Sequence, residues 1–181
     1  EWERIPPTKL QQLVSSVPKR LLSVFFKPLC PSLSWEETKY MFLFADTAKV
    51  AFSYASGLNG VLKAQSSGFI LVFRKKITDV GKTYNTITGV FTAPRRGVYY
   101  FRFNLLGCSS SNGVFVSLNK NKEQILYVTE KPRGSCETAS GGATLLLRKG
   151  DHVYVVLNRN SEIFDNKNNY CTFSGFLLFP M

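Results

Sequence analysis

The sequence predicts an all-β fold, an antiparallel sandwich or barrel, preceded by an irregular N-terminal extension. Short runs of β-branched and aromatic residues recur from Val50 to the C-terminus, and turn-forming residues separate them. Prolines interrupt residues 1–48 repeatedly, and no convincing helical pattern follows residue 48. A chain of 181 residues has room for one domain with an extension, and two large domains are excluded.

The extension contains one short helical pattern, residues 10–17, which ends at Pro18. A helix this short is marginal on its own. We therefore expect residues 1–48 to be flexible or loosely docked, with the stub of an oligomerising helix as the alternative.

After residue 48 the expected strands and connections alternate along the chain. The strand candidates are residues 50–54, 69–73, 86–91, 98–106, 114–118, 124–129, 143–147, 152–157 and 172–179. Connections are expected at residues 57–60, 93–94, 109–113, 119–122, 141–142, 149–151 and 158–169. This spacing favours antiparallel strands over alternating βαβ units.

Two strands indicate how their faces are used. Alternation in the strand 98–106 predicts a core face that carries Tyr99, Phe101 and Phe103. Tyr100 and Arg102 lie on its other face, where a solvated strand more often carries Thr, Ser or Lys, so we expect a partner subunit to cover them; the alternative is a solvent-exposed tyrosine. The strand 172–179 is apolar on both faces after Gly175, which predicts a central strand or an interface.

The formal net charge of +11 lies almost entirely after residue 48. Residues 1–48 carry six basic and five acidic side chains, and the remainder carries seventeen and seven. Such an excess attracts anionic phospholipid, polyanionic glycan or nucleic acid, with general solubility as the alternative. The basic residues expected in exposed turns, as an anion-binding surface, are Arg95, Arg96, Lys120, Lys122, Lys131, Arg133, Arg148, Lys149 and Arg159.

The sequence argues against several other functions. Asp151 and His152 are adjacent on a strand and point to opposite faces, and no catalytic motif occurs, so we expect no enzyme. Specific nucleic-acid binding is not expected, because no recognition helix is predicted. No apolar run is long enough to span a membrane.

Metal sites and cofactors are not predicted either. Four cysteines stand too far apart for a zinc site, and the chain has one histidine. Calcium is possible but unsupported, because the acids that would hold it are scattered along the sequence. These acids are Asp79, Asp151, Glu162 and Asp165.

One set of spacings resembles the signature of the complement C1q globular-head family. The signature positions are Phe73, Asp79, Tyr84, Phe91, Gly97, Tyr99, Phe101 and Phe103. Residues 50–53, residues 147–153 and the stretch around Phe173 and Gly175 agree with the same family. The resemblance covers residues 49–181, which we expect to form a C1q-like domain, whereas residues 1–48 resemble nothing that we identify.

The resemblance implies a ten-stranded jelly roll, shared with the tumour necrosis factor family, in a secreted homotrimer or heterotrimer. If the trimer forms, the bulky and apolar side chains on the face opposite the core make Tyr100, Arg102, Phe176 and Leu178 the expected subunit contact. The resemblance also implies a disulfide between Cys108 and Cys136, which would close about 29 residues and stabilise by roughly 2 to 4 kcal/mol. Cys171 is then expected as a buried thiol, and Cys30 as free or intermolecular.

Two functions fit this resemblance. The first is a secreted, extracellular innate-immune recognition head that binds anionic glycan, lipid or microbial surfaces. The second is an extracellular signalling ligand or cerebellin-like synaptic organiser, which would bind a protein receptor through loops such as 109–113 and 161–169. No Gly-x-y repeat precedes the head here, so relatives without a collagen stalk fit better.

Overall fold

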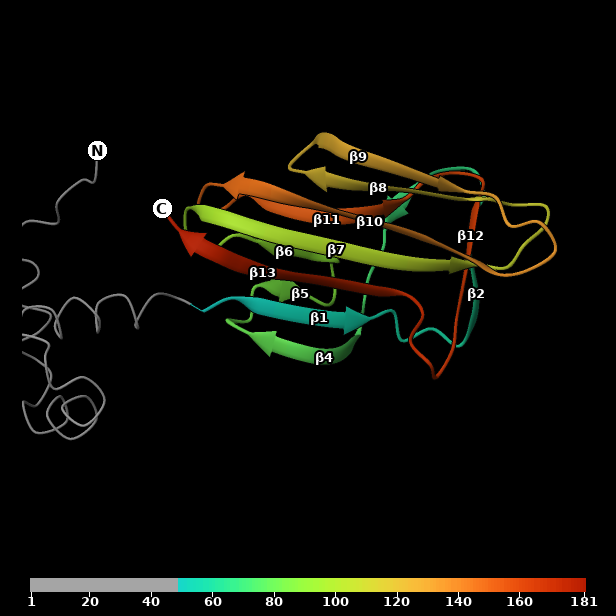
Figure 1. Cartoon of the computed structure of the whole chain (residues 1–181), viewed down its shortest axis with the longest axis horizontal. Helices are drawn as coiled ribbons and strands as arrows, with labels where there is room; N and C mark the ends of the chain where they lie inside the picture. Colours follow the sequence, from blue (N-terminus) through green and yellow to red (C-terminus); the bar gives the residue numbers. More distant parts are fainter. Residues whose placement is uncertain (1–48) are drawn as a thin grey trace, which may run out of the picture. The chain divides into compact units, whose positions relative to one another are not determined.

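The computed structural model describes residues 49–181 as two antiparallel β-sheets packed face to face (Figure 1). The expectations for residues 1–48, including the helix at 10–17 and the state of Cys30, lie outside the described residues. The described part contains strands, turns and loops, and no helix. The predicted all-β class and the antiparallel sandwich are therefore confirmed.

The first sheet has the strand order β2-β12-β7-β13-β1-β4, and β10 pairs with β7. Its strands are β1 (Ala51–Ala55), β2 (Gly60–Ala64), β4 (Lys75–Val80), β7 (Gly97–Gly107), β10 (Glu137–Leu147), β12 (Ser161–Asp165) and β13 (Thr172–Pro180). The strand β13 lies between β7 and β1, as its apolar sequence predicted.

The second sheet has the order β5-β6-β11-β8-β9, and β3 pairs with β11. Its strands are β3 (Phe69–Ile70), β5 (Tyr84–Asn85), β6 (Val90–Thr92), β8 (Val114–Lys120), β9 (Glu123–Glu130) and β11 (His152–Leu157). Residues 49–181 thus form thirteen strands, three of which, β3, β5 and β6, have only two or three residues.

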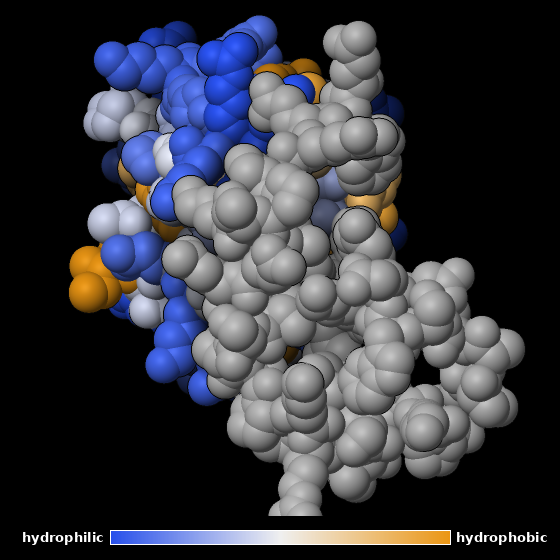
Figure 2. Space-filling view, turned by 90° about the vertical axis from the view of Figure 1, so that its left-hand side faces the viewer, coloured by the Kyte–Doolittle hydropathy of each residue, from blue (hydrophilic) through white to orange (hydrophobic). Residues whose placement is uncertain are grey.

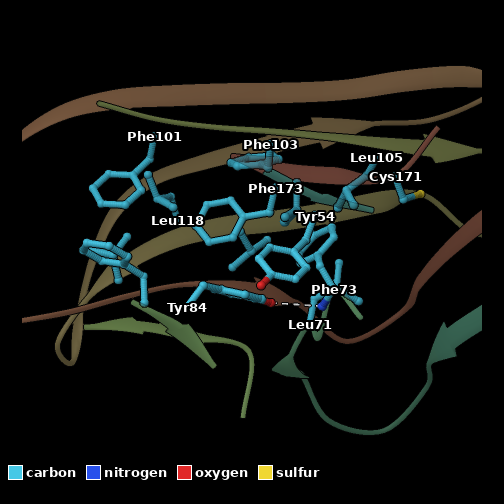
Figure 3. Close-up of a cluster of buried hydrophobic side chains, with 14 of the residues drawn as sticks. Tyr54, Leu71, Phe73, Tyr84, Phe101, Phe103, Leu105, Leu118, Cys171 and Phe173 are labelled. Carbon is cyan, nitrogen blue, oxygen red and sulfur yellow. Dashed lines mark hydrogen bonds between the residues drawn. The ribbon is translucent and has the colours of Figure 1, made fainter. Parts of the chain in front are cut away.

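The core between the sheets is aromatic (Figure 3). Tyr99, Phe101 and Phe103 point inward from β7 and are fully buried, which confirms the predicted core face. The ring of Phe52 packs edge-on against Phe173, with centroids 5.2 Å apart. Buried rings supply large apolar area and prefer such tilted contacts.

The signature positions serve this core. All of them except Asp79, which is half-buried in β4, are buried. Gly175 is required because a Cβ there would lie 2.6 Å from Cδ1 of Phe101, closer than packed atoms can approach. The residues of the family signature are therefore ones that pack in the core. Their spacings reflect which residues of each strand point into the core.

The expected strand at residues 86–91 is wrong, because a tight turn divides it. The Oδ1 of Asn85 accepts hydrogen bonds from the backbone N–H groups of Ile87 (2.8 Å) and Thr88 (3.1 Å). Gly89, with φ at 75°, donates its N–H to the carbonyl of Asn85 at 2.9 Å. An Asx turn followed by a left-handed glycine outweighs the β propensity of the neighbouring residues.

The connection expected at Gly141 and Gly142 is also wrong, because both residues lie within β10. A Cβ on Gly141 would lie 2.9 Å from Cζ of Phe103. A Cβ on Gly142 would lie 2.6 Å from the carbonyl oxygen of Phe101. These glycines permit a close approach of β10 to β7 and do not mark a turn.

Four strands have no counterpart among the expectations: β2, β4, β5 and β12. Most of β4 is exposed, so its sequence has no apolar alternation. The strand β12 lies inside the polar stretch 158–169, which was expected to be a connection, and it buries two acids, Glu162 and Asp165. Because buried carboxylates need partners, only the tertiary contacts could place this strand.

The cysteines follow the expectations within residues 49–181. Cys108 and Cys136 form a disulfide. Cys171 is fully buried, where its thiol donates to the carbonyl of Phe164 at 3.3 Å. Burial raises the pKa of Cys171 to about 12, so this thiol stays protonated.

Candidate binding surfaces

Three loops and the C-terminus meet at one end of the sandwich, on the left in Figure 1. Backbone hydrogen bonds join them. The N–H of Gly150 donates to the carbonyl oxygen of Ala93 (2.8 Å), and the N–H of Met181 donates to the carbonyl oxygen of Arg96 (3.1 Å). The Asn121 N–H donates to His152 at 2.8 Å. We call this surface the basic end because it carries Arg95, Arg96, Lys120, Lys122, Arg148 and Lys149.

Most charges at the basic end face solvent. Arg96, Lys122, Arg148 and Lys149 are exposed, and Arg95 is half-buried. Lys120 differs, because its Nζ donates to the carbonyl of Leu146 at 3.0 Å and pairs with Asp151 at 3.5 Å. Lys120 therefore stabilises the loops, and its ammonium group, already paired with Asp151, is less available to a ligand.

Asp151 is the acidic side chain bound within this group of loops. The backbone N–H of Arg148 donates to its Oδ2 at 2.9 Å, and Asn121 donates to its Oδ1 at 3.3 Å. The hydrogen bond from the Arg148 backbone, with smaller effects of Asn121 and Lys120, lowers the pKa of Asp151. The Asp151 carboxylate is therefore already hydrogen-bonded within the loops, and the exposed cations remain in excess.

Lys49 and Lys82 join the same end, and the sequence analysis missed both. A Cβ on Gly81 would lie 2.7 Å from the carbonyl oxygen of Lys49, so the turn after β4 meets the start of β1. Both lysines are exposed. The sequence analysis could have placed these two lysines at the basic end only if it had predicted the strand β4. The coloured residues in Figure 2 are mostly hydrophilic at this end, with small hydrophobic patches.

The remaining three predicted basic residues lie at the other end of the sandwich. Lys131 and Arg133 belong to the loop that the disulfide ties to the end of β7, and Arg159 follows β11; all three are exposed. The strand β7 has eleven residues, which at about 3.3 Å each separates the two ends by roughly 30 Å. One small ligand cannot contact both groups.

The residues predicted to contact other subunits gather on the outer face of the first sheet. Tyr100 in β7 lies opposite Phe176 in β13, with ring centroids 5.6 Å apart. Phe176 is 42% exposed and Leu178 is 48% exposed. Arg102 is exposed beside them and its Nε donates to Asn104 Oδ1 at 3.4 Å. We call this group the outer apolar face.

Of the acids considered for calcium, Glu162 and Asp165 share β12, whereas Asp79 lies in β4 and Asp151 precedes β11. Within residues 49–181 no group of three or more His, Cys, Asp or Glu side chains is placed to hold a metal ion. Asp165 accepts one hydrogen bond from the hydroxyl of Ser56, and Glu162 pairs with Lys63 at 3.0 Å. Asp79 contributes, after burial itself, to raising the pKa of Tyr54.

Residues 51–178 match the family model of the C1q domain. The chain belongs to the C1q domain family. Because the signature residues form the core of the described sandwich, the match and the structure agree. Residues 49–181 contain no helix that could cross a membrane.

Among curated proteins, the chain is similar to Complement C1q tumor necrosis factor-related protein 3 of Mus musculus and of Homo sapiens. Each is 33% identical over 116 residues, which cover 64% of this chain and 46% of the relative. The match therefore spans about half the length of these relatives.

Solved structures share the fold at low identity. The globular domain of zebrafish complement 1qA has a TM-score of 0.58 at 23% identity, covering 74% of this chain and 99% of that one. Eiger TNF from S. frugiperda has a TM-score of 0.60 at 14% identity, covering 75% and 96%. Murine APRIL has a TM-score of 0.57 at 12% identity, covering 72% and 99%. These likenesses confirm the predicted C1q and tumour necrosis factor jelly roll.

Proposed function

We propose that this chain is a secreted, trimeric and non-catalytic binding head whose basic end recognises anionic surfaces. The anionic partner would be a sulfated or phosphorylated glycan, a lipid headgroup or a microbial surface. In this proposal residues 49–181 are the binding domain and residues 1–48 are an extension to it.

The observation that carries the proposal is the convergence of exposed cations from loops far apart in the sequence. Arg96, Lys122, Arg148 and Lys149 come from three different connections, and Asp151 among them is already engaged. Each exposed ionic contact contributes only about 0 to 1 kcal/mol, so affinity requires several contacts together. Three heads in one assembly would multiply the contacts through avidity.

The outer apolar face supports the trimer in this proposal. Tyr100, Phe176 and Leu178 leave apolar surface uncovered in the single chain. Apolar patches of this kind commonly mark contacts between proteins. Membership of the C1q domain family supports the same arrangement, because members of that family form trimers.

Heparin binding by the full chain tests the basic end. We expect the affinity to fall steeply as salt rises from low to high concentration, because exposed charges are screened. We expect the double variant Arg148→Gln/Lys149→Gln to bind at least fivefold more weakly in surface plasmon resonance.

A matched control removes the same charge from the other end. The double variant Lys131→Gln/Arg133→Gln also loses one lysine and one arginine from an exposed loop, and we expect less than a twofold effect. Equal losses in the two double variants would contradict a localised site, and salt-independent binding would contradict an electrostatic one.

A second candidate function is a ligand for a protein receptor, and one surface feature favours it. Phe115 and Tyr127 line an open hollow on the second sheet, together with Arg159. Tyr127 is 45% exposed. Aromatic and arginine side chains commonly dominate the binding energy of protein interfaces.

One comparison separates the two candidates. In a screen of the full chain against both receptor ectodomains and polyanions, a receptor ligand would lose its partner on Tyr127→Ala. It would keep the partner on Arg148→Gln/Lys149→Gln. The anionic-surface head would show the opposite pattern.

A further inference from the structure

A second hollow lies at the end of the sandwich opposite the basic end, between two loops that are side by side at the lower right of Figure 1. One wall is formed by residues 57–59 of the β1–β2 loop and by Lys75 at the start of β4. The other wall is formed by Asn166, Lys167 and Asn169 of the β12–β13 loop. Its volume of about 430 Å³ is within the range of small-ligand sites. We call it the amide hollow.

A buried carboxylate fastens both walls of the amide hollow. Asp165 is fully buried and accepts a hydrogen bond from the hydroxyl of Ser56, which itself accepts from Leu58 N–H at 3.1 Å. On the other side, the N–H groups of Asn166 and Tyr170 each donate to Asp165 Oδ1 at 2.8 Å. The two loops are therefore held in one arrangement before any ligand arrives, which lowers the ordering cost of binding.

The lining combines positive charge with carboxamides. Lys75 and Lys167 are exposed, and no acidic side chain lines the hollow. The Nζ of Lys75 donates to Asn169 Oδ1 at 2.9 Å, which holds these two side chains together. Among the hydrogen bonds of residues 49–181, none uses the amide nitrogens of Asn59, Asn166 or Asn169, so three carboxamides retain donors for a ligand.

We propose that the amide hollow binds an acidic sugar, with its carboxylate at Lys75 and Lys167 and its hydroxyls at the asparagine amides. A carboxamide both donates and accepts, as a sugar hydroxyl does, so the pair can match around a ring. A charge-assisted contact between an ammonium group and a carboxylate adds selectivity for the acidic sugar. Because the hollow is open, it would take a terminal sugar residue of a glycan.

This proposal is independent of the basic end. None of the residues lining the amide hollow was singled out for the anion-binding surface, and the two sites lie at opposite ends of β7. The two proposals can therefore fail separately.

The test is a titration of the full ¹⁵N-labelled chain, followed by amide shifts in TROSY spectra. The probes are glucuronate, glucose with the same ring and no charge, and acetate with the charge and no ring. We expect glucuronate to produce saturable shifts at residues 57–59 and 166–169. We expect glucose and acetate to bind at least tenfold more weakly.

Two double variants complete the test. Lys75→Gln/Lys167→Gln keeps polar side chains of similar length and is expected to weaken glucuronate binding at least tenfold. Lys131→Gln/Arg133→Gln also removes two positive charges, from an exposed loop that does not line the hollow, and is expected to leave the glucuronate affinity within twofold. Unchanged amide positions elsewhere in each spectrum show that the variant is folded.

Three results would overturn the proposal: no saturable shift at the hollow, equal affinity for acetate and glucuronate, or unchanged glucuronate binding in Lys75→Gln/Lys167→Gln. Equal affinity for acetate and glucuronate would mean that the hollow binds anions in general and does not recognise the sugar ring. Loss of heparin binding in Arg148→Gln/Lys149→Gln would concern the basic end alone.

Discussion

At the scale of single residues, Tyr84 contributes to the core in two ways, through the stacking of its ring and through a buried hydrogen bond of its hydroxyl. Its ring stacks on Phe52 with centroids 5.2 Å apart. Its hydroxyl oxygen accepts a hydrogen bond from the backbone N–H of Phe73 at 3.0 Å (Figure 3). Burial raises the pKa of Tyr84 to about 12, so the phenol stays neutral.

Tyr84→Phe should therefore destabilise the fold without changing the packing of the ring. The Phe73 N–H would be left buried without its partner, at a cost of about 1 to 3 kcal/mol. Urea unfolding, monitored by circular dichroism, measures the difference in unfolding free energy between the variant and the unsubstituted chain. Tyr127→Phe, at an exposed position, is the control and should change stability by less than about 0.5 kcal/mol. Equal effects would contradict the structural role of the Tyr84 hydroxyl.

Alkaline pH should destabilise the fold through the same buried groups. Cys171 and Tyr84 ordinarily ionise at 9.0 and 10.0, and burial raises both pKa values to about 12. Between these limits the unfolded chain loses protons that the folded chain retains, so the stability present below pH 9 is lost as pH rises towards 12. Unfolding free energies at a series of pH values should fall by a few kcal/mol. In Cys171→Ala the fall should be smaller, and an identical pH dependence would contradict the assignment.

At the scale of elements, β10 shows how glycine permits two strands to lie close together. In β10, Gly142 lies opposite Arg102 of β7, and the space for a Cβ is occupied by the backbone carbonyl of Phe101. A side-chain contact could relax by rotation, but a carbonyl within a paired strand cannot move without distorting the sheet.

Gly142→Ala should therefore cost about 1 to 3 kcal/mol through overpacking, although alanine is a small residue. Thermal unfolding measures the loss. Ser140→Ala, at an exposed position of the same strand, is the matched control and should be close to neutral. If both variants unfolded at the same temperature, the close approach of β10 to β7 would be wrong.

At the scale of the whole molecule, the proposed assembly of heads depends on the outer apolar face. Phe176 and Tyr100 pack against each other on the outer surface of the first sheet, and neither belongs to the core. A charge at Phe176 would cost little in a single chain, where the side chain is 42% exposed. In a trimer that buries this face, the same charge would be desolvated without a partner.

Phe176→Glu should therefore convert a trimer into folded monomers, as measured by sedimentation velocity together with circular dichroism. Ile87→Glu is the control, because Ile87 is 85% exposed in the turn after β5 and should leave the trimer intact. A wild-type chain that sediments as a monomer at micromolar concentration would contradict the proposed assembly.

The sequence predicted the elements whose own residues alternate between core and solvent. In β7 the rings at Tyr99, Phe101 and Phe103 recur every second residue, and this period assigns a face without knowledge of neighbours. The same local pattern located β8 and β11, and the family signature located the core. Where apolar alternation was absent, as in β4, or where acids were buried, as in β12, the prediction failed.

The sequence by itself determined the all-β class, the core face and the family of this protein, because strand alternation and signature spacings are properties of neighbouring residues. Only the tertiary structure decided which cations share one end, and which loops form the amide hollow. Residues 57–59 and 166–169 are more than a hundred positions apart, and a buried carboxylate at Asp165 brings their loops together. Contacts over such separations depend on strand pairing and loop closure, which leave no periodic pattern in the sequence.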